Sequence, residues 1–366
     1  MRPLSAIKYI RSCMGKLLPI IITVCLGVAI MYFMVMFVNQ LGQSVNIMGL
    51  YPYENASMVW GGKKGIDATD SKNIIDYSKS KGAQTFSVDG YSINYNIVVG
   101  KTGGTILMTG KDDIKDIVNT LKLIISEGNL PQKQGEILLD ERLAKNYGLS
   151  VGSIVKKNTD GWYVNMDLKI AGIYRGKAAM GIGIIDKQYL NLGEPYISLA
   201  ITGPAESIKD INNYLDEFSS KYTVNTFQSE SKMLNKLNGP IAAMETFCGV
   251  ILVGVIGIFI ANITSIQYTV RKKELELLHA IGYSRGYIVM KSFKEMSIAA
   301  LIGYVLGIGV AVLIGWIMNI YMLEENGTAM TLILPKDIIL MLLIPLCLSL
   351  FSILAPIKLT KFKELA

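Results

Sequence analysis

Few residues of this chain could perform catalysis or hold a metal ion. His279 is the only histidine among the 366 residues, and the four cysteines are far apart in the sequence. Zinc sites use several His and Cys ligands at short spacings, and disulfide-stapled scaffolds use closely spaced sets of cysteines. The sequence therefore predicts no metal ligands, no catalytic residues and no disulfide framework.

Two short motifs resemble sites of chemistry. Val99–Thr102 is similar to the end of a phosphate-binding loop, but that loop has a glycine five residues before its second glycine, and position 95 is Tyr. We interpret this motif as a turn at the end of a strand. Asp140 and Glu141 are adjacent carboxylates at the start of an expected helix, where the helix dipole favours negative charge; the alternative is a catalytic pair. The chain is predicted to be non-enzymatic and to bind no cofactor itself.

The composition indicates a membrane protein. Hydrophobic residues make up 51% of the chain and charged residues 18%, with a mean hydropathy of +0.38; soluble domains are typically about 45–50% apolar and about 25% charged. A helix of about 20 apolar residues crosses a hydrocarbon core of ~30 Å. Four segments of at least 20 residues contain no Asp, Glu, Lys or Arg, and we predict a transmembrane α-helix in each: 17–38, 246–270, 296–323 and 338–357.

The distribution of Lys and Arg predicts the orientation of these helices. Segments 1–16, 271–295 and 358–366 together carry a net charge of +9, whereas segment 39–245 is neutral and segment 324–337 carries −2. Basic residues concentrate on the cytoplasmic side of membrane proteins. We therefore expect both termini inside the cell, and we attribute the basic pI to membrane topology rather than to nucleic-acid binding. The expected order is a cytoplasmic segment (1–16), helix 17–38, an extracytoplasmic domain (39–245), helix 246–270, a cytoplasmic loop (271–295), helix 296–323, a short outer loop (324–337), helix 338–357 and a cytoplasmic tail (358–366).

The segment 39–245 is long enough to form one or two folded units. It alternates runs rich in Val, Ile, Tyr and Thr with helical runs, which predicts a large α/β (α+β) domain. The expected strands are Tyr91–Val99, Thr105–Met108, Ile154–Lys157, Trp162–Ile173 and Tyr196–Thr202. The expected helices are Ser71–Lys81, Asp112–Ser126, Asp140–Tyr147 and Ala205–Tyr222.

The cytoplasmic loop contains the most informative pattern. Leu275, Leu278 and Ile281 recur at helical spacing, and Gly282 follows them. This predicts a short amphipathic helix at the membrane surface that ends at Gly282. Such a helix could simply join two spans, or it could be a docking element for a cytoplasmic partner.

The third predicted span carries small residues at every fourth position. Small residues on one stripe of a membrane helix let a second backbone approach closely. We therefore predict a helix-packing face formed by Ala299, Gly303, Gly307, Ala311 and Gly315.

The cytoplasmic loop also resembles a family signature. Its pattern is similar to R-x-x-E-I-x-x-L-R-A-x-G-x-[ST]-[RK]-x-x-I of FtsX/MacB-type permeases, the membrane subunits of ATP-binding-cassette (ABC) systems that transmit motion across the membrane. The matching residues are Arg271, Glu274, Leu275, Leu278, Ala280, Gly282, Ser284, Arg285 and Ile288. Looser similarities cover Glu127–Pro131, Gly135–Ala144, Gly148–Gly152, Leu168–Tyr174 and Pro356–Ala366. Two residues depart from the signature: His279 replaces the usual Arg, and Glu276 replaces a common Gly. Both lie on the helix expected to contact the ATPase, so we expect the partner's groove to differ from that of other family members.

The resemblance implies a bacterial plasma-membrane subunit with several spans, whose sites serve assembly. It implies cytoplasmic ABC ATPase subunits that use ATP and Mg, a second permease subunit in a homo- or heterodimer, and an extracytoplasmic adaptor or substrate protein as a further partner. The expected cargo is a peptide, an antibiotic or a lipid-linked molecule. The alternatives are a regulator of a cell-wall hydrolase and a membrane receptor without an ATPase. The expected ATPase-docking residues are Arg271, Glu274, Leu275, Leu278, His279, Gly282 and Arg285.

Overall fold

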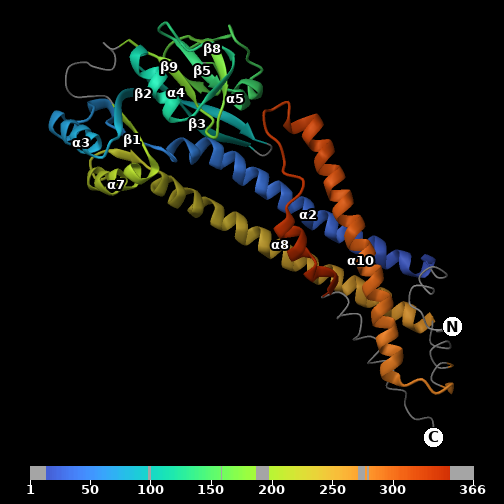
Figure 1. Cartoon of the computed structure of the whole chain (residues 1–366). Coiled ribbons are helices and arrows are strands. Elements are labelled where there is room, and N and C mark those ends of the chain that lie inside the picture. The colour runs from blue at the N-terminus through green and yellow to red at the C-terminus, as the bar shows by residue number, and fades with distance from the viewer. Residues whose placement is uncertain are drawn as a thin grey trace. The chain divides into compact units, whose positions relative to one another are not determined.

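The computed structural model describes residues 14–97, 100–157, 159–186, 198–270, 277 and 280–346. The chain divides into two compact units (Figure 1). We call them the helical unit (Met1–Asn39, Pro240–Met318 and Met330–Ala366) and the sheet domain (Gln40–Gly239 and Asn319–Ala329).

Long apolar helices dominate the helical unit. The helices are α2 (Met14–Gly49), α8 (Phe227–Val270), α10 (Arg285–Met318), which continues as a π-helical turn (Asn319–Leu323), and α11 (Pro335–Met341). Within the described residues, two stretches are long and apolar enough to cross a membrane, Leu17–Gly49 and Val289–Leu323. They contain the first and third predicted spans. The second predicted span lies within α8, the fourth lies largely outside the described residues, and a count of four membrane helices stays a prediction.

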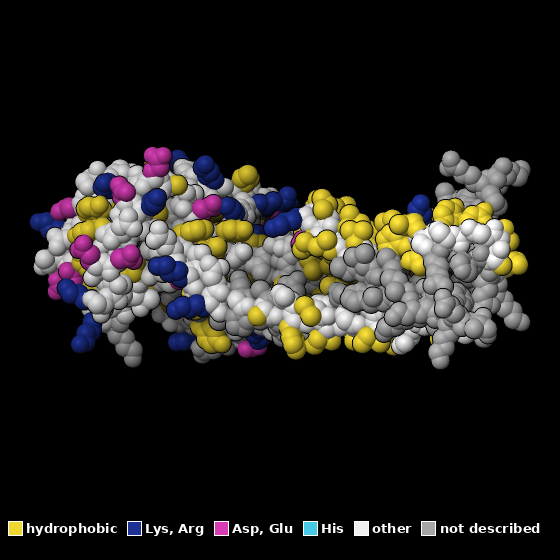
Figure 2. Space-filling model, turned by 90° about the horizontal axis from the view of Figure 1, so that it is seen from below, with side chains coloured by type: hydrophobic (Ala, Val, Ile, Leu, Met, Phe, Trp, Pro, Cys, Tyr) yellow, Lys and Arg dark blue, Asp and Glu magenta, His cyan; other side chains and the backbone are white. Residues whose placement is uncertain are grey.

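One face of α2 is exposed although its side chains are apolar. Leu18, Ile22, Leu26 and Ile30 follow one another at every fourth position, and about half of each side chain is exposed. Figure 2 shows hydrophobic side chains over the helical unit, whereas Lys, Arg, Asp and Glu gather on the sheet domain. Apolar residues on all sides of a helix are typical of a membrane environment.

The sheet domain is built on an eleven-stranded mixed sheet, which confirms a large domain of mixed α and β structure. The strand order is β11-β1-β10-β2-β3-β9-β5-β8-β4, with β6 beside β8 and β7 beside β2. Most neighbours are antiparallel, but β3–β9 and β5–β8 are parallel. The strands are β1 (Ala56–Trp60), β2 (Gln84–Ile97), β3 (Gly100–Thr109), β4 (Ile124–Gly128), β5 (Glu136–Asp140), β6 (Ile154–Val155), β7 (Trp162–Tyr163), β8 (Leu168–Arg175), β9 (Gly181–Ile184), β10 (Ser198–Thr202) and β11 (Thr223–Asn225).

Within the described residues, four short α-helices accompany this sheet: α3 (Ala68–Ser80), α4 (Ile114–Thr120), α5 (Glu141–Asn146) and α7 (Ala205–Leu215). Helices α3 and α7 share one hydrophobic cluster with β1 and β10, and Figure 1 shows both beside β1. Asp67 caps α3 by accepting a hydrogen bond from the backbone N–H of Thr69. Tyr77 of α3 stacks on Tyr214 of α7, with ring centroids 4.1 Å apart. The amphipathic pattern of each helix thus places its apolar face in the core.

Several predicted elements were wrong in extent. The stretch Asp112–Ser126 is not one helix, because α4 ends at Thr120 and the chain enters β4. Lys122 has a φ of 53°, and the N–H groups of Lys122 and Leu123 bond back to the helix carbonyls of Asn119 and Val118. This is the Schellman arrangement, which usually has glycine at the left-handed position. Because this position holds a lysine instead of a glycine, the sequence pattern does not indicate where the helix ends.

The predicted strand Trp162–Ile173 is in fact two strands, β7 and β8, separated by residues 164–167. They pair with different neighbours, because β7 lies beside β2 and β8 lies between β5 and β4. The predicted helix Ala205–Tyr222 ends at Leu215 and is followed by a 3-10 turn, Asp216–Phe218. The ends of these elements depend on contacts between distant parts of the chain, which a local sequence pattern does not show.

Candidate functional site

The predicted docking helix lies mostly outside the described residues. Arg271, Glu274, Leu275, Leu278 and His279 belong to that part of the chain, and their role stays a prediction. Two of the expected docking residues lie within the described part of the chain. Gly282 has a φ of 99°, which glycine adopts readily, and Arg285 is the first residue of α10.

The start of α10 is capped from within the loop. The Oγ of Ser284 accepts a hydrogen bond from the backbone N–H of Tyr287 at 3.3 Å. Serine is a preferred residue at this position because its oxygen satisfies a free N–H of the first turn. The Gly-Tyr-Ser-Arg part of the signature therefore turns the chain and begins α10.

The small residues of α10 lie where α2 comes closest. A Cβ atom on Gly303 would be 2.8 Å from the carbonyl oxygen of Ile21, and one on Gly307 would be 2.7 Å from that of Cys25. Ala299 and Ala311 are fully buried. A Cβ on Gly315, by contrast, would meet the side chain of Leu332 at 2.9 Å. The stripe thus contacts another helix and a loop of the same chain.

Residues 324–329, here named the docked loop, pack against the sheet domain. The Tyr95 hydroxyl of β2 donates to the carbonyl of Gly327 at 3.2 Å, and the Asn146 Nδ2 of α5 donates to the carbonyl of Asn326 at 2.9 Å. Gly327 has a φ of 71°, and a Cβ there would lie 2.3 Å from the carbonyl oxygen of Arg142. The segment Asn319–Ala329, which follows α10, is therefore part of the sheet domain.

Sequence reasoning placed 324–337 between two spans and assigned it no contact. Asn326-Gly327 was the available signal, because Asn-Gly is a strong turn dipeptide. That signal predicts a turn but does not indicate what the turn touches. The turn contacts Tyr95 and Asn146, which belong to β2 and α5.

Beneath the docked loop lies a buried ion pair. Asp140 is 1% exposed, and its carboxylate accepts from Nε and Nη2 of Arg142, both at 2.9 Å. Its Oδ1 also accepts from the backbone N–H of Arg142, which caps α5. The Arg142 Nη2 donates in addition to the carbonyl of Gly176 at 2.8 Å. The predicted role of Asp140 at a helix start is confirmed, but the sequence pattern did not indicate its partly exposed partner Arg142.

The electrostatics of this pair differ from those of its neighbour Glu141. Burial raises the pKa of Asp140 above its ordinary value, although Arg142 opposes this effect. Glu141 is on the surface, where hydrogen bonds from Arg175 and Lys145 lower the pKa of its carboxyl. The two carboxylates therefore pair with different cations, Asp140 with Arg142 and Glu141 with Arg175 and Lys145. Among the described residues, no group of three or more His, Cys, Asp or Glu side chains could hold a metal ion.

Replacing Gly327 by alanine should undock the loop. The substitution adds a Cβ both at a positive φ and against the backbone of Arg142. Gly148→Ala is the matched control, because Gly148 has a φ of 61° but no atom within 4 Å of a Cβ. We expect Gly327→Ala to lower the free energy of unfolding by about 1–3 kcal/mol more than the control does. Thermal unfolding of the purified full chain measures this difference, and equal losses in the two variants would contradict the contact.

Comparison with known proteins identifies the C-terminal third of the chain. Residues 246–365 match the family model of the FtsX-like permease C-terminal domain. A search of curated proteins finds no match. Among solved structures, the chain is similar to the extracellular domain of the noncanonic ABC-type transporter YknZ from Gram-positive bacteria. The two sequences are 13% identical, the match covers 47% of this chain and 97% of that chain, and the TM-score is 0.27. It is also similar to the periplasmic region of MacB from Actinobacillus actinomycetemcomitans. Here the identity is 14%, the match covers 52% of this chain and 95% of that chain, and the TM-score is 0.25. The resemblance to FtsX-like permeases is thus confirmed over residues 246–365.

Proposed function

Since residues 246–365 carry the FtsX-like permease domain, we propose that this membrane protein is the permease subunit of an ABC complex and transmits ATPase-driven motion to its sheet domain. The family match is the observation that carries this proposal. The chain itself is non-catalytic and binds no cofactor, and a separate cytoplasmic ATPase uses ATP and Mg. The proposed work is export or extraction of a peptide, an antibiotic or a lipid-linked molecule.

Chain connectivity supports a mechanical role. Helix α2 contributes residues both to the helical unit and to the sheet domain, and so does α8. The docked loop adds a third link, because the π-helical turn that continues α10 leads directly into it. Movement of the cytoplasmic loop 271–295 would therefore reach the sheet domain along α8 and α10, which flank the loop, and along α2, which contacts α10.

The proposed topology places the chain in a bacterial plasma membrane with several spans. Both termini and loop 271–295 lie in the cytoplasm, as the charge distribution favours, and the sheet domain lies outside. Two permease subunits, identical or related, assemble with two ATPase subunits. An adaptor or substrate protein outside the membrane would bind the sheet domain.

The docking helix provides the decisive experiment. If Glu274 pairs with a basic side chain of the ATPase, Glu274→Gln leaves that cation unpaired at a cost of roughly 2–5 kcal/mol, which is a loss of about 30-fold or more in affinity. Glu276→Gln is the matched control, because it makes the same change two residues away and would weaken the helix dipole interaction equally. His279→Arg restores the residue typical of the family and should be tolerated.

The measurement is co-purification of a nucleotide-hydrolysing subunit with the tagged full chain from its native host. The expected result is strong retention by wild type, Glu276→Gln and His279→Arg, and a sharp loss for Glu274→Gln. Equal retention by all four proteins would remove the docking role of Glu274. Absence of any ATPase in every sample would instead favour a membrane receptor and refute the ABC proposal.

A further inference from the structure

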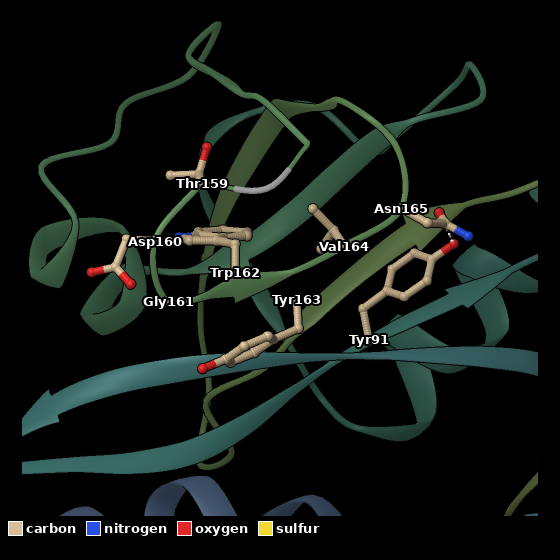
Figure 3. A pocket seen from close by; sticks show the side chains of 8 residues that line it. All are labelled: Tyr91, Thr159, Asp160, Gly161, Trp162, Tyr163, Val164 and Asn165. Carbon is tan, nitrogen blue, oxygen red and sulfur yellow. Dashed lines mark hydrogen bonds between the residues drawn. The ribbon is translucent and has the colours of Figure 1, made fainter.

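A groove of about 590 Å³ lies on the sheet domain beside β7. It is lined by Tyr91 of β2 and by residues 159–165 (Figure 3). This volume is in the range of small-molecule sites, where a few polar groups orient a ligand over an apolar surface. The groove is remote in sequence from the family-matched residues 246–365, and none of the functions considered above uses it.

The two ends of the groove present different hydrogen-bonding groups. Figure 3 shows the carboxylate of Asp160 at one end and the amide of Asn165 beside the Tyr91 ring at the other. The Tyr91 hydroxyl donates to Asn165 Oδ1 at 2.5 Å. Burial raises the pKa of Tyr91, so its hydroxyl keeps the proton that makes this bond. The Asn165 Nδ2, with two N–H donors, has no partner among the described residues.

An accessible aromatic ring lies between these ends. The Tyr163 side chain is 63% exposed, and its hydroxyl accepts from Asn94 Nδ2 at 3.4 Å. Its neighbour Trp162 is 2% exposed and packs edge-on against Tyr147 at 5.3 Å between ring centroids. A buried aromatic anchor therefore holds β7, while the next residue offers a ring to solvent.

The wall of the groove is fixed before any ligand binds. The Tyr147 hydroxyl donates to the carbonyl of Asn94 at 2.6 Å, and the Asn94 N–H donates to the carbonyl of Gly161 at 2.7 Å. The Trp162 N–H closes a turn onto the carbonyl of Thr159 at 2.9 Å. Binding here would cost little conformational entropy, because the lining residues are already held.

We infer that this groove binds a neutral saccharide. A pyranose ring has an apolar face of C–H groups that can cover the Tyr163 ring, and hydroxyl groups around its rim that both donate and accept. Asp160 accepts from such hydroxyls, and Asn165 donates to them. A cationic peptide suits the groove less well, because Lys101 Nζ already lies 3.7 Å from the Asp160 carboxylate.

The test is calorimetric titration of the full chain in lipid nanodiscs, which avoid detergents with sugar headgroups. The probes are the tetrasaccharides of N-acetylglucosamine and of glucose, with tetra-arginine as the cationic competitor. We expect saturable binding of at least one tetrasaccharide. Tyr163→Ala should weaken it at least tenfold by removing the ring, and Asn165→Asp should do so by replacing the donor while keeping the acceptor for Tyr91.

Asn73→Asp is the matched control, because it adds the same charge at an exposed site on α3 and should leave binding unchanged. Unchanged thermal unfolding of the variants would show that they fold. The inference is overturned if neither tetrasaccharide binds, if all variants bind equally, or if tetra-arginine binds with the same dependence on Tyr163 and Asn165. Saccharide binding requires no ATPase, so this result is independent of the docking experiment.

Discussion

Gly307→Leu is expected to lower the thermal unfolding midpoint of the full chain by roughly 5–10 °C. A leucine Cβ would lie 2.7 Å from the carbonyl oxygen of Cys25 and 2.8 Å from Cβ of Val28. The carbonyl is backbone and cannot rotate away, so α2 and α10 must separate. Small residues allow close contact between membrane helices, and a bulky one forfeits the packing along the whole stripe.

Gly309→Leu is the matched control on the same helix. No atom lies within 4 Å of a Cβ on Gly309, so the same side chain adds volume without contacting α2. Both proteins are purified in one detergent and heated side by side. A midpoint that falls equally in both variants would mean that α2 does not contact this stripe.

Arg142→Leu is expected to lower the free energy of unfolding by about 3–5 kcal/mol at neutral pH. The substitution leaves the Asp140 carboxylate buried without its cation and removes the hydrogen bond to the carbonyl of Gly176. Arg175→Leu is the control, because Arg175 is 68% exposed in its ion pair with Glu141. Exposed ion pairs contribute about 0–1 kcal/mol, so the control should lose little. Thermal and denaturant unfolding of the full chain measure both.

The pH dependence separates the lost ion pair from a simple packing defect. Burial already raises the pKa of Asp140 in the folded protein, and removal of Arg142 raises it further. The folded variant therefore holds the proton more tightly than the unfolded chain, whose Asp pKa is about 3.9. Protonation of Asp140 therefore stabilises the folded variant. This stabilisation is fully present below the unfolded pKa of about 3.9 and is lost as the pH rises through the pKa of Asp140 in the folded variant. The deficit of Arg142→Leu should be smaller at pH 5 than at pH 8, and a constant deficit would contradict the assignment.

The elements found from the sequence are those with a local signal. Helix α3 was predicted at Ser71–Lys81 and found at Ala68–Ser80, and its pattern and cap lie within one segment. Strand β5 was missed, because Glu136–Asp140 is a short run just before a helix and its neighbours β8 and β9 follow much later in the chain. A strand of this kind is stabilised by partners that no local pattern shows.

The same limit applies to the candidate site. The glycines of α10 were found because a four-residue period is visible in one segment. The docked loop was not found, because its contacts join Gly327 to Tyr95 and to the backbone of Arg142 across more than 180 residues. Arg142 could not be recognised as the partner of Asp140 either, because adjacent charged residues at a helix start usually face solvent.

The docked loop also has a consequence for the order of synthesis. The sheet domain includes residues Asn319–Ala329, whose last residue emerges from the ribosome 90 residues after Gly239, the end of the domain's main segment. At about 5–20 residues per second, the nascent domain would wait roughly 5–20 s with Tyr95, Arg142 and Asn146 uncovered. During that interval the rest of α8 and all of α10 are synthesised, so completion of the domain follows the production of both helices.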